Sequence, residues 1–206
     1  MARLERAALC DLFLEVGPDQ PTLCTGWTTR DLAAHLVVRE RRPDAAAGIM
    51  FKPLAGHGER VRRQTAAQPF ESLVRQLRTP PVWSLGAVGP LDRMTNTLEF
   101  FIHHEDVRRA GTGWRPRPLS RAYGSALWAV VPGSARLGLR RLPFGVSLQA
   151  PGYGTAKAGN GEPLVTLTGD PGELALFLSG RQRVAAVELT GPDELTAKLR
   201  EARLGI

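Results

Sequence analysis

The chain has 206 residues, a net charge of +7 and an arginine-rich composition with only two cysteines. It has no apolar run of about 18 residues or more, so no membrane-spanning helix is expected. Its basic residues are scattered and lack the patterns of known nucleic-acid readers, so no nucleic-acid partner is expected. The first residues mix charges and lack the apolar region of a signal peptide, and the two cysteines suggest no disulfide framework. A cytoplasmic location is therefore expected.

The N-terminal half predicts a helix bundle. Residues 3–16 carry an apolar stripe at helical spacing and end at Gly17. Thr28 and Asp31 form a capping-box pattern that opens a second helix, which we expect to end near Arg42 before a proline.

Residues 43–69 contain several prolines and glycines, and we expect His57 to lie there in a loop. Residues 70–78 predict a third helix, Trp83 begins a loop, and residues 91–109 predict the fourth helix.

The pattern changes after a glycine- and proline-rich linker at residues 111–118. One helix is expected over residues 120–137, and the glycines at 152–154 and 159–161 are interpreted as hairpin turns. The remaining elements are strands at 146–150, 164–168 and 186–190, and helices at 171–179 and 193–203. The sequence therefore predicts an α+β protein, with a four-helix bundle at residues 1–112 and a small α/β domain at residues 113–206.

Three residues of the bundle form a candidate metal site. Glu99 and His103 are four residues apart, so on a helix they share one face. His35 lies on the apolar face of the second helix, where a lone histidine is usually a packed core residue. Two histidines and one carboxylate from two helices suit a reactive site with an open coordination position. This ligand set admits zinc, nickel, manganese or iron(II).

The neighbours of these residues have less certain roles. Asp106 is three residues after His103 and either accepts the imidazole N–H of that ligand or lies on the surface. His104 is interpreted as a supporting or surface residue, and Glu105 as part of a surface ion pair. Cys24 is either a thiol near the metal or a small buried residue. The roles of Cys24, His57 and His104 stay open.

The chain resembles the DinB-like superfamily that includes the N-terminal domain of mycothiol-dependent maleylpyruvate isomerase. The resemblance lies in Pro21-Thr-Leu-Cys-Thr-Gly-Trp27, in Asp31-Leu-Ala-Ala-His35 with the residues that follow, and in Asn96-Thr-Leu-Glu99-Phe-Phe-Ile-His103. It implies a divalent metal, often zinc, held by His35, Glu99 and His103. It also implies mycothiol as a cofactor and a tail arginine near the active site, for which Arg181 is the matching candidate.

The resulting hypothesis is a metal-dependent transferase or isomerase that uses mycothiol on a small-molecule substrate. Arg181 would clamp a substrate carboxylate, and Arg39 would either meet an anionic substrate or pair with a ligand carboxylate. Zinc is the favoured metal, with nickel or iron as alternatives. A metal-dependent hydrolase of a small amide or ester and a non-catalytic metal-binding module remain open. No membrane partner is expected, and the protein is predicted to be a monomer or homodimer.

Overall fold

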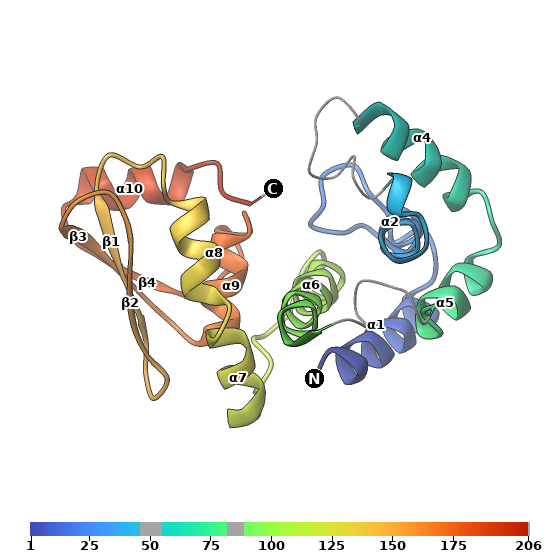
Figure 1. The fold of residues 1–206 in the computed structure, drawn as a ribbon, viewed down its shortest axis with the longest axis horizontal. Helices are drawn as coiled ribbons and strands as arrows, with labels where there is room; N and C mark the ends of the chain where they lie inside the picture. Colours follow the sequence, from blue (N-terminus) through green and yellow to red (C-terminus); the bar gives the residue numbers. More distant parts are fainter. Residues whose placement is uncertain (46–54, 82–88, 206) are drawn as a thin grey trace. The chain divides into compact units, whose positions relative to one another are not determined.

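The structure is a computed structural model that describes residues 1–45, 55–81 and 89–205, with only the backbone of residues 89–95. Its contacts divide the chain into two compact units, Met1–Trp114 and Arg115–Ile206 (Figure 1). The first is helical and the second contains a four-stranded sheet with helices, so the predicted α+β class is confirmed. Whether the domains expected at 1–112 and 113–206 fold independently stays a prediction. Among the described helices, none has the length and apolar composition needed to span a bilayer.

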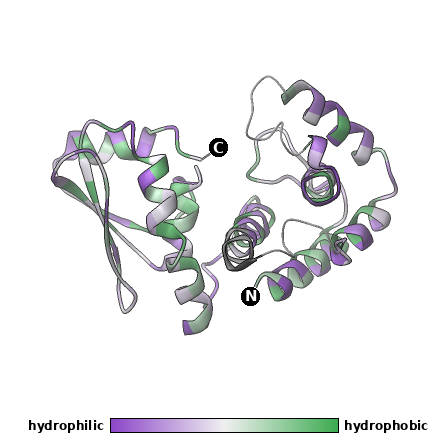
Figure 2. Ribbon diagram, viewed as in Figure 1, coloured by the Kyte–Doolittle hydropathy of each residue, from purple (hydrophilic) through white to green (hydrophobic). Residues whose placement is uncertain are grey.

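The first unit is a bundle whose helices carry apolar residues on their inward faces. Helices α1 and α5 are amphipathic and show both hydrophilic and hydrophobic residues (Figure 2). The largest fully buried side chains, among them Phe13, Leu36 and Phe100, form the core between the helices. The helices are α1 (Ala2–Val16), α2 (Thr29–Arg41), α4 (Ala55–Ala66), α5 (Phe70–Arg78) and α6 (Gly89–Arg108).

Helix α4 is an addition to the predicted four-helix bundle. It contacts α2 and α5, and it contains His57, which sequence reasoning wrongly placed in a loop. The glycines on either side of His57 suggested a break, but Gly56 lies in the helix with open space where a Cβ would be. His57 Nε2 lies 3.0 Å from Asp44 Oδ2, and its side chain is 42% exposed. The loop predicted to begin at Trp83 falls mostly outside the described residues.

The second unit contains a sheet with the strand order β2-β1-β3-β4. Strand β1 pairs antiparallel with β2 and parallel with β3, and β3 pairs antiparallel with β4. Its core includes Val146, Leu148, Val165 and Leu167, together with the whole of the buried helix α9. The elements are α7 (Arg121–Trp128), α8 (Val131–Gly138), β1 (Gly145–Ala150), β2 (Gly154–Gly159), β3 (Pro163–Thr168), α9 (Pro171–Leu178), β4 (Glu188–Thr190) and α10 (Asp193–Glu201).

Three sequence-based expectations for this unit were wrong. The single helix expected at 120–137 is split into α7 and α8, because Pro132 has no N–H to continue α7 and instead starts α8. Strand β2 was missed, and the turn at 159–161 is not a hairpin turn, because β1 lies between β2 and β3. Strand β4 is also shorter than the strand expected at 186–190.

Candidate metal centre

His35 is placed by a helix start that the sequence encodes locally. The predicted capping box is present at the beginning of α2, where Asp31 Oδ2 accepts hydrogen bonds from the backbone N–H and the hydroxyl of Thr28, each at 3.0 Å. Leu32 and Leu36 are then fully buried on the inward face. The His35 side chain near them is 15% exposed.

Glu99 and His103 are placed by α6 in the same way. The adjacent Phe100 is fully buried in the bundle core, which fixes the rotation of the helix about its axis. With that ring packed inward, Glu99 and His103 lie one helical turn apart and approach His35 of α2. The Glu99 side chain is 26% exposed and that of His103 is 10% exposed.

The donor atoms of these three residues converge on one point. Glu99 Oε1 lies 3.3 Å from His103 Nε2 and 3.7 Å from His35 Nε2. The centroids of the two imidazole rings are 5.4 Å apart, with a 72° angle between their planes. Donors around a tetrahedral zinc ion are separated by about 3.3–3.8 Å, from bond lengths of about 2.0–2.3 Å. The group therefore fits a divalent metal with little rearrangement, although metal binding itself stays a prediction.

Neighbouring side chains hold each member of this group. Asp106 Oδ2 lies 2.9 Å from His103 Nδ1, so the alternative of a surface Asp106 is wrong. The ring of Trp27 lies 5.1 Å from that of His35. Both contacts restrict an imidazole ring, as supporting residues commonly do around metal ligands.

Arg39 contacts the candidate carboxylate ligand. Its Nε lies 3.3 Å from Glu99 Oε1, and its Nη1 donates a hydrogen bond of 2.7 Å to Asn96 Oδ1. Of the two roles expected for Arg39, pairing with the carboxylate is the one seen in the structure. A catalytic contact between Arg39 and substrate stays a prediction.

The three groups have coupled acid–base properties. Burial opposes the charge on His103, but hydrogen bonds to Asp106, Cys24 and Glu99 outweigh it and hold the His103 pKa well above its usual value. Burial also raises the pKa of Glu99, but the histidines and Arg39 outweigh that effect and hold it well below its usual value. Burial lowers the pKa of His35 in spite of its hydrogen bond to Glu99. Without metal, these shifts therefore favour a neutral His35 and a His103 that is protonated on both ring nitrogens and positively charged.

We expect zinc affinity to rise with pH because of the proton on His103 Nε2. An ion that binds His103 Nε2 must displace this proton, so affinity should increase about tenfold per pH unit up to the raised His103 pKa. The free energy of unfolding of the metal-free protein should change in the opposite direction. Protonated His103 contributes its full stabilisation below about pH 6.5, and this contribution is lost as pH rises through the raised pKa. Competition with a chromophoric chelator and thermal unfolding, both across this pH range, measure the two trends. A zinc affinity independent of pH would contradict them.

Two further expectations for α6 were wrong. His104 is buried, and its Nδ1 lies 2.8 Å from Glu5 Oε1 of α1. Glu105 does form the expected ion pair at helical spacing, with Oε2 2.6 Å from Arg109 Nε, but it is completely buried, so only the expected surface location is wrong. Because these residues face away from the metal group, α6 has buried polar side chains on more than one side.

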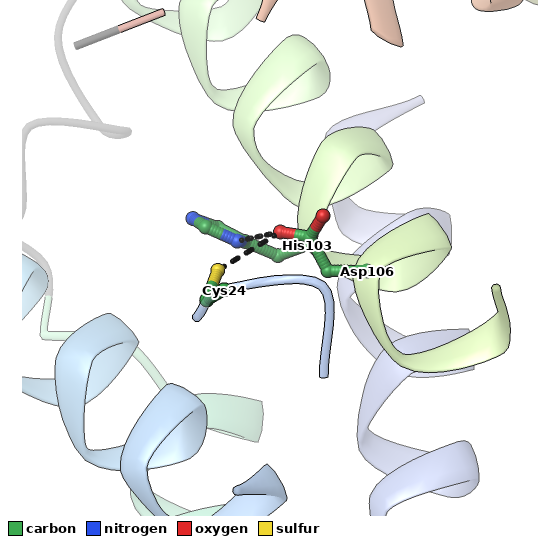
Figure 3. A group of neighbouring side chains, drawn as sticks. All are labelled: Cys24, His103 and Asp106. Carbon is green, nitrogen blue, oxygen red and sulfur yellow. Dashed lines mark hydrogen bonds and ion pairs between the residues drawn. The ribbon is translucent and has the colours of Figure 1, made fainter. Parts of the chain in front are cut away.

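The structure adds a thiol to the surroundings of His103. Cys24 Sγ lies 3.2 Å from Asp106 Oδ2, and Figure 3 shows the Cys24 and His103 contacts meeting at the Asp106 carboxylate. The sequence indicated the two alternatives for Cys24 but not its pairing with Asp106, because 82 positions separate them.

A hollow of about 500 Å³ lies elsewhere in this unit, with Leu12, Val107 and Trp114 in its lining and none of the three candidate ligands.

Arg181 belongs to the second unit, just beyond the end of α9. Its Nη1 donates a hydrogen bond to the carbonyl of Ser179 at 2.5 Å. A role for Arg181 in binding substrate stays a prediction.

The fold and the donor group together define a helix bundle with a candidate His-Glu-His metal centre, joined to an α+β unit. Residues 2–99 match the family model described as the mycothiol maleylpyruvate isomerase N-terminal domain. Most of the bundle is therefore similar to this domain, and the superfamily resemblance found in the sequence is confirmed. The match includes His35 and Glu99 and stops before His103, so the place of His103 in the group rests on the geometry.

Solved structures extend the similarity over both units. A crystal structure of the mycothiol-dependent maleylpyruvate isomerase aligns with a TM-score of 0.59 and 14% identity, over 92% of this chain and 90% of that chain. A histidine-to-alanine mutant of the mycothiol-dependent maleylpyruvate isomerase aligns with a TM-score of 0.58 and 15% identity, over the same shares. At this identity the comparisons establish a shared fold. No curated protein matches the sequence.

Proposed function

We propose that the protein is a divalent-metal-dependent enzyme that uses a low-molecular-weight thiol, in the manner of mycothiol, to isomerise or modify a small molecule. The observation that carries the proposal is the convergence of His35 Nε2, Glu99 Oε1 and His103 Nε2 from two helices. The similarity to a mycothiol-dependent isomerase directs the choice of cofactor. Zinc is the favoured ion because two imidazoles and one carboxylate suit it, with nickel or iron as alternatives.

The chemistry of the donor set fits this assignment. A bound zinc ion would supply a Lewis acid that favours the ionised form of a thiol. When an ion displaces the Nε2 proton of His103, Asp106 would keep the remaining proton on Nδ1, so that the Nε2 lone pair beside Glu99 can bind the ion. Arg39 keeps Glu99 ionised and oriented toward the two rings. In this proposal the three donors are thus positioned to bind one ion, and a tetrahedral ion would keep its fourth coordination position open for cofactor or substrate.

The substrate class proposed is a small carboxylic acid. In this proposal Arg181 binds a substrate carboxylate through its planar guanidinium, which forms paired hydrogen bonds with such groups. The name of the similar enzyme suggests maleylpyruvate and related unsaturated diacids as the first substrates to test.

The test combines metal content with thiol dependence. We expect the native protein to bind about one equivalent of zinc and His35→Ala to bind much less, measured by elemental analysis after loading and gel filtration. Turnover of an unsaturated diacid should then require both zinc and mycothiol. A protein that binds no metal would overturn the proposal, and metal-dependent hydrolysis of a small amide or ester without any thiol would instead indicate a hydrolase.

A further inference from the structure

His103 presents one ring nitrogen to each of two donor groups. Its Nε2 lies 3.3 Å from Glu99 Oε1, within the candidate centre described above. Its Nδ1 lies 2.9 Å from Asp106 Oδ2, and Asp106 Oδ2 lies 3.2 Å from Cys24 Sγ. The donor atoms of Cys24, His103 and Asp106 all lie within 4.8 Å of one another, as do those of His35, Glu99 and His103. The ring therefore belongs to two groups that are each suited to a cation.

The second group is held together by the segment that precedes α2. The backbone N–H of Leu23 donates a 3.0 Å hydrogen bond to the carbonyl of Asp106, which fixes this segment against α6. Thr22 Oγ1 accepts a hydrogen bond from the Cys24 N–H at 3.2 Å and donates one to the Trp27 carbonyl at 2.9 Å. Figure 3 shows the thiol approaching the His103 and Asp106 side chains from this segment. Cys24 is thus positioned by backbone contacts rather than by chance packing.

We propose that Cys24 Sγ, His103 Nδ1 and Asp106 Oδ2 form a second metal site, which is selective for thiophilic ions and competes with the first site for His103. The competition for His103 rests on the proposed function, because it requires that the His35-Glu99-His103 centre bind a metal. A thiolate, an imidazole and a carboxylate are established zinc ligands, and the sulfur makes the set softer than the first one. Cadmium, the softer ion, should therefore favour this set, whereas zinc, manganese and iron(II) should favour the first.

Competition follows from the chemistry of one imidazole ring. A neutral imidazole has one lone-pair nitrogen and one N–H, so it can ligate through Nε2 or through Nδ1 but not through both. With an ion at Nε2, the Nδ1–H donates to Asp106; with an ion at Nδ1, the Nε2–H donates to Glu99. Each donor group thereby accepts the ring proton when the other holds the metal. The same two carboxylates serve both states without rearrangement of the helices.

The distances allow such a site at small cost. Tetrahedral zinc with one sulfur ligand separates its donors by about 3.4–3.6 Å. The observed 2.9 Å and 3.2 Å separations need to widen by only a few tenths of an ångström when the hydrogen bonds are replaced by coordination. On binding, the Cys24 thiol and the protonated His103 each lose one proton to solvent, as metal-bound cysteines and histidines do. The Cys24 side chain is partly exposed, which gives its proton and the ion access.

Cadmium titration tests the proposal, because coordination by a thiolate adds charge-transfer absorption in the ultraviolet. We expect this absorption to saturate at a single equivalent in the native protein and in His35→Ala, and to be lost in Cys24→Ser. The other thiol provides a matched control: Cys10 is buried in the core, with its pKa raised to about 11, so Cys10→Ala should keep the full signal. Absence of the absorption from native protein, or its persistence in Cys24→Ser, would overturn the second site.

The same variants separate this proposal from the proposed function. Cys24→Ser keeps the first donor set, so it should still bind manganese or zinc by elemental analysis. If His35→Ala loses all metal, and the native protein titrated with cadmium shows no thiolate charge-transfer absorption, the first site is supported and the second is ruled out. If His35→Ala keeps a thiolate-bound ion while Cys24→Ser binds nothing, the second site stands and the first fails. Binding of two ions per native chain would overturn the competition for His103. Asp106→Asn, expected to weaken cadmium binding in the His35→Ala background, gives a second check should Cys24→Ser fold poorly.

Discussion

Replacement of Glu99 by glutamine is expected to reduce zinc affinity by about a hundredfold or more, because the loss of a ligand should exceed the 10- to 100-fold loss typical of a supporting residue. Glu99 Oε1 is the atom shared by the two imidazoles, at 3.3 Å and 3.7 Å, and it supplies the only negative charge of the first donor set. Glutamine has nearly the same shape but no charge, so the loss measures the anionic ligand rather than packing. Thiol-dependent turnover should fall with the metal. Zinc affinity is measured by competition with a chelator, with the fold monitored by circular dichroism.

Glu5→Gln provides the matched control for this substitution. Glu5 also contacts a histidine of α6, at 2.8 Å from His104 Nδ1, and it is buried like a ligand would be. It belongs to neither of the candidate metal groups found among the described residues. We therefore expect Glu5→Gln to change stability but leave zinc affinity unchanged. Equal zinc affinity in native protein and Glu99→Gln would contradict the ligand assignment.

The donor group was predictable from the sequence because its members depend on local signals. The Thr28 and Asp31 pattern fixes where α2 begins, and that start determines which face His35 occupies. The four-residue spacing of Glu99 and His103 likewise places both on one face of α6. Local signals do not predict that α2 and α6 are neighbours in the bundle, and the superfamily resemblance supplied that expectation. The convergence seen in the structure agrees with these signals, while occupancy by a metal stays to be measured.

Other features depend on contacts between distant residues, and the sequence did not reveal them. The pairing of Cys24 with Asp106 joins a loop to a helix far along the chain. Strand β2 contains glycine and alanine, which have low strand propensity, and it exists through its full antiparallel pairing with β1. His104 looked like a surface residue because it is polar, but its partner Glu5 on α1 allows it to be buried. In each case tertiary partners outweighed the local preference.

The second large effect expected concerns stability, and it centres on a buried ion pair that crosses the bundle. Arg6 of α1 donates to both carboxylate oxygens of Glu40 of α2, at 2.6 Å and 2.5 Å, and to the Leu77 carbonyl of α5 at 2.8 Å. Its guanidinium also lies 4.5 Å from the centroid of the Phe100 ring on α6. Glu40→Leu would leave the Arg6 charge buried without its carboxylate, and breaking such a pair costs about 3–5 kcal/mol. Urea unfolding of the metal-free protein measures the loss.

Two comparisons determine whether the loss comes from the unpaired charge. Replacing both partners, as in Arg6→Met with Glu40→Leu, removes the charge and should recover most of the stability, short of the hydrogen bond lost at the Leu77 carbonyl, which contributes about 1 kcal/mol. The exposed pair between Arg78 and Asp11 also joins two helices, at 2.7 Å, with side chains 41% and 69% exposed. Asp11→Asn should therefore cost less than about 1 kcal/mol, because solvent screens that pair. Equal losses for Glu40→Leu and Asp11→Asn would show that burial does not set the strength of the Arg6–Glu40 pair. A double variant as unstable as Glu40→Leu would instead assign the loss to packing around Phe100.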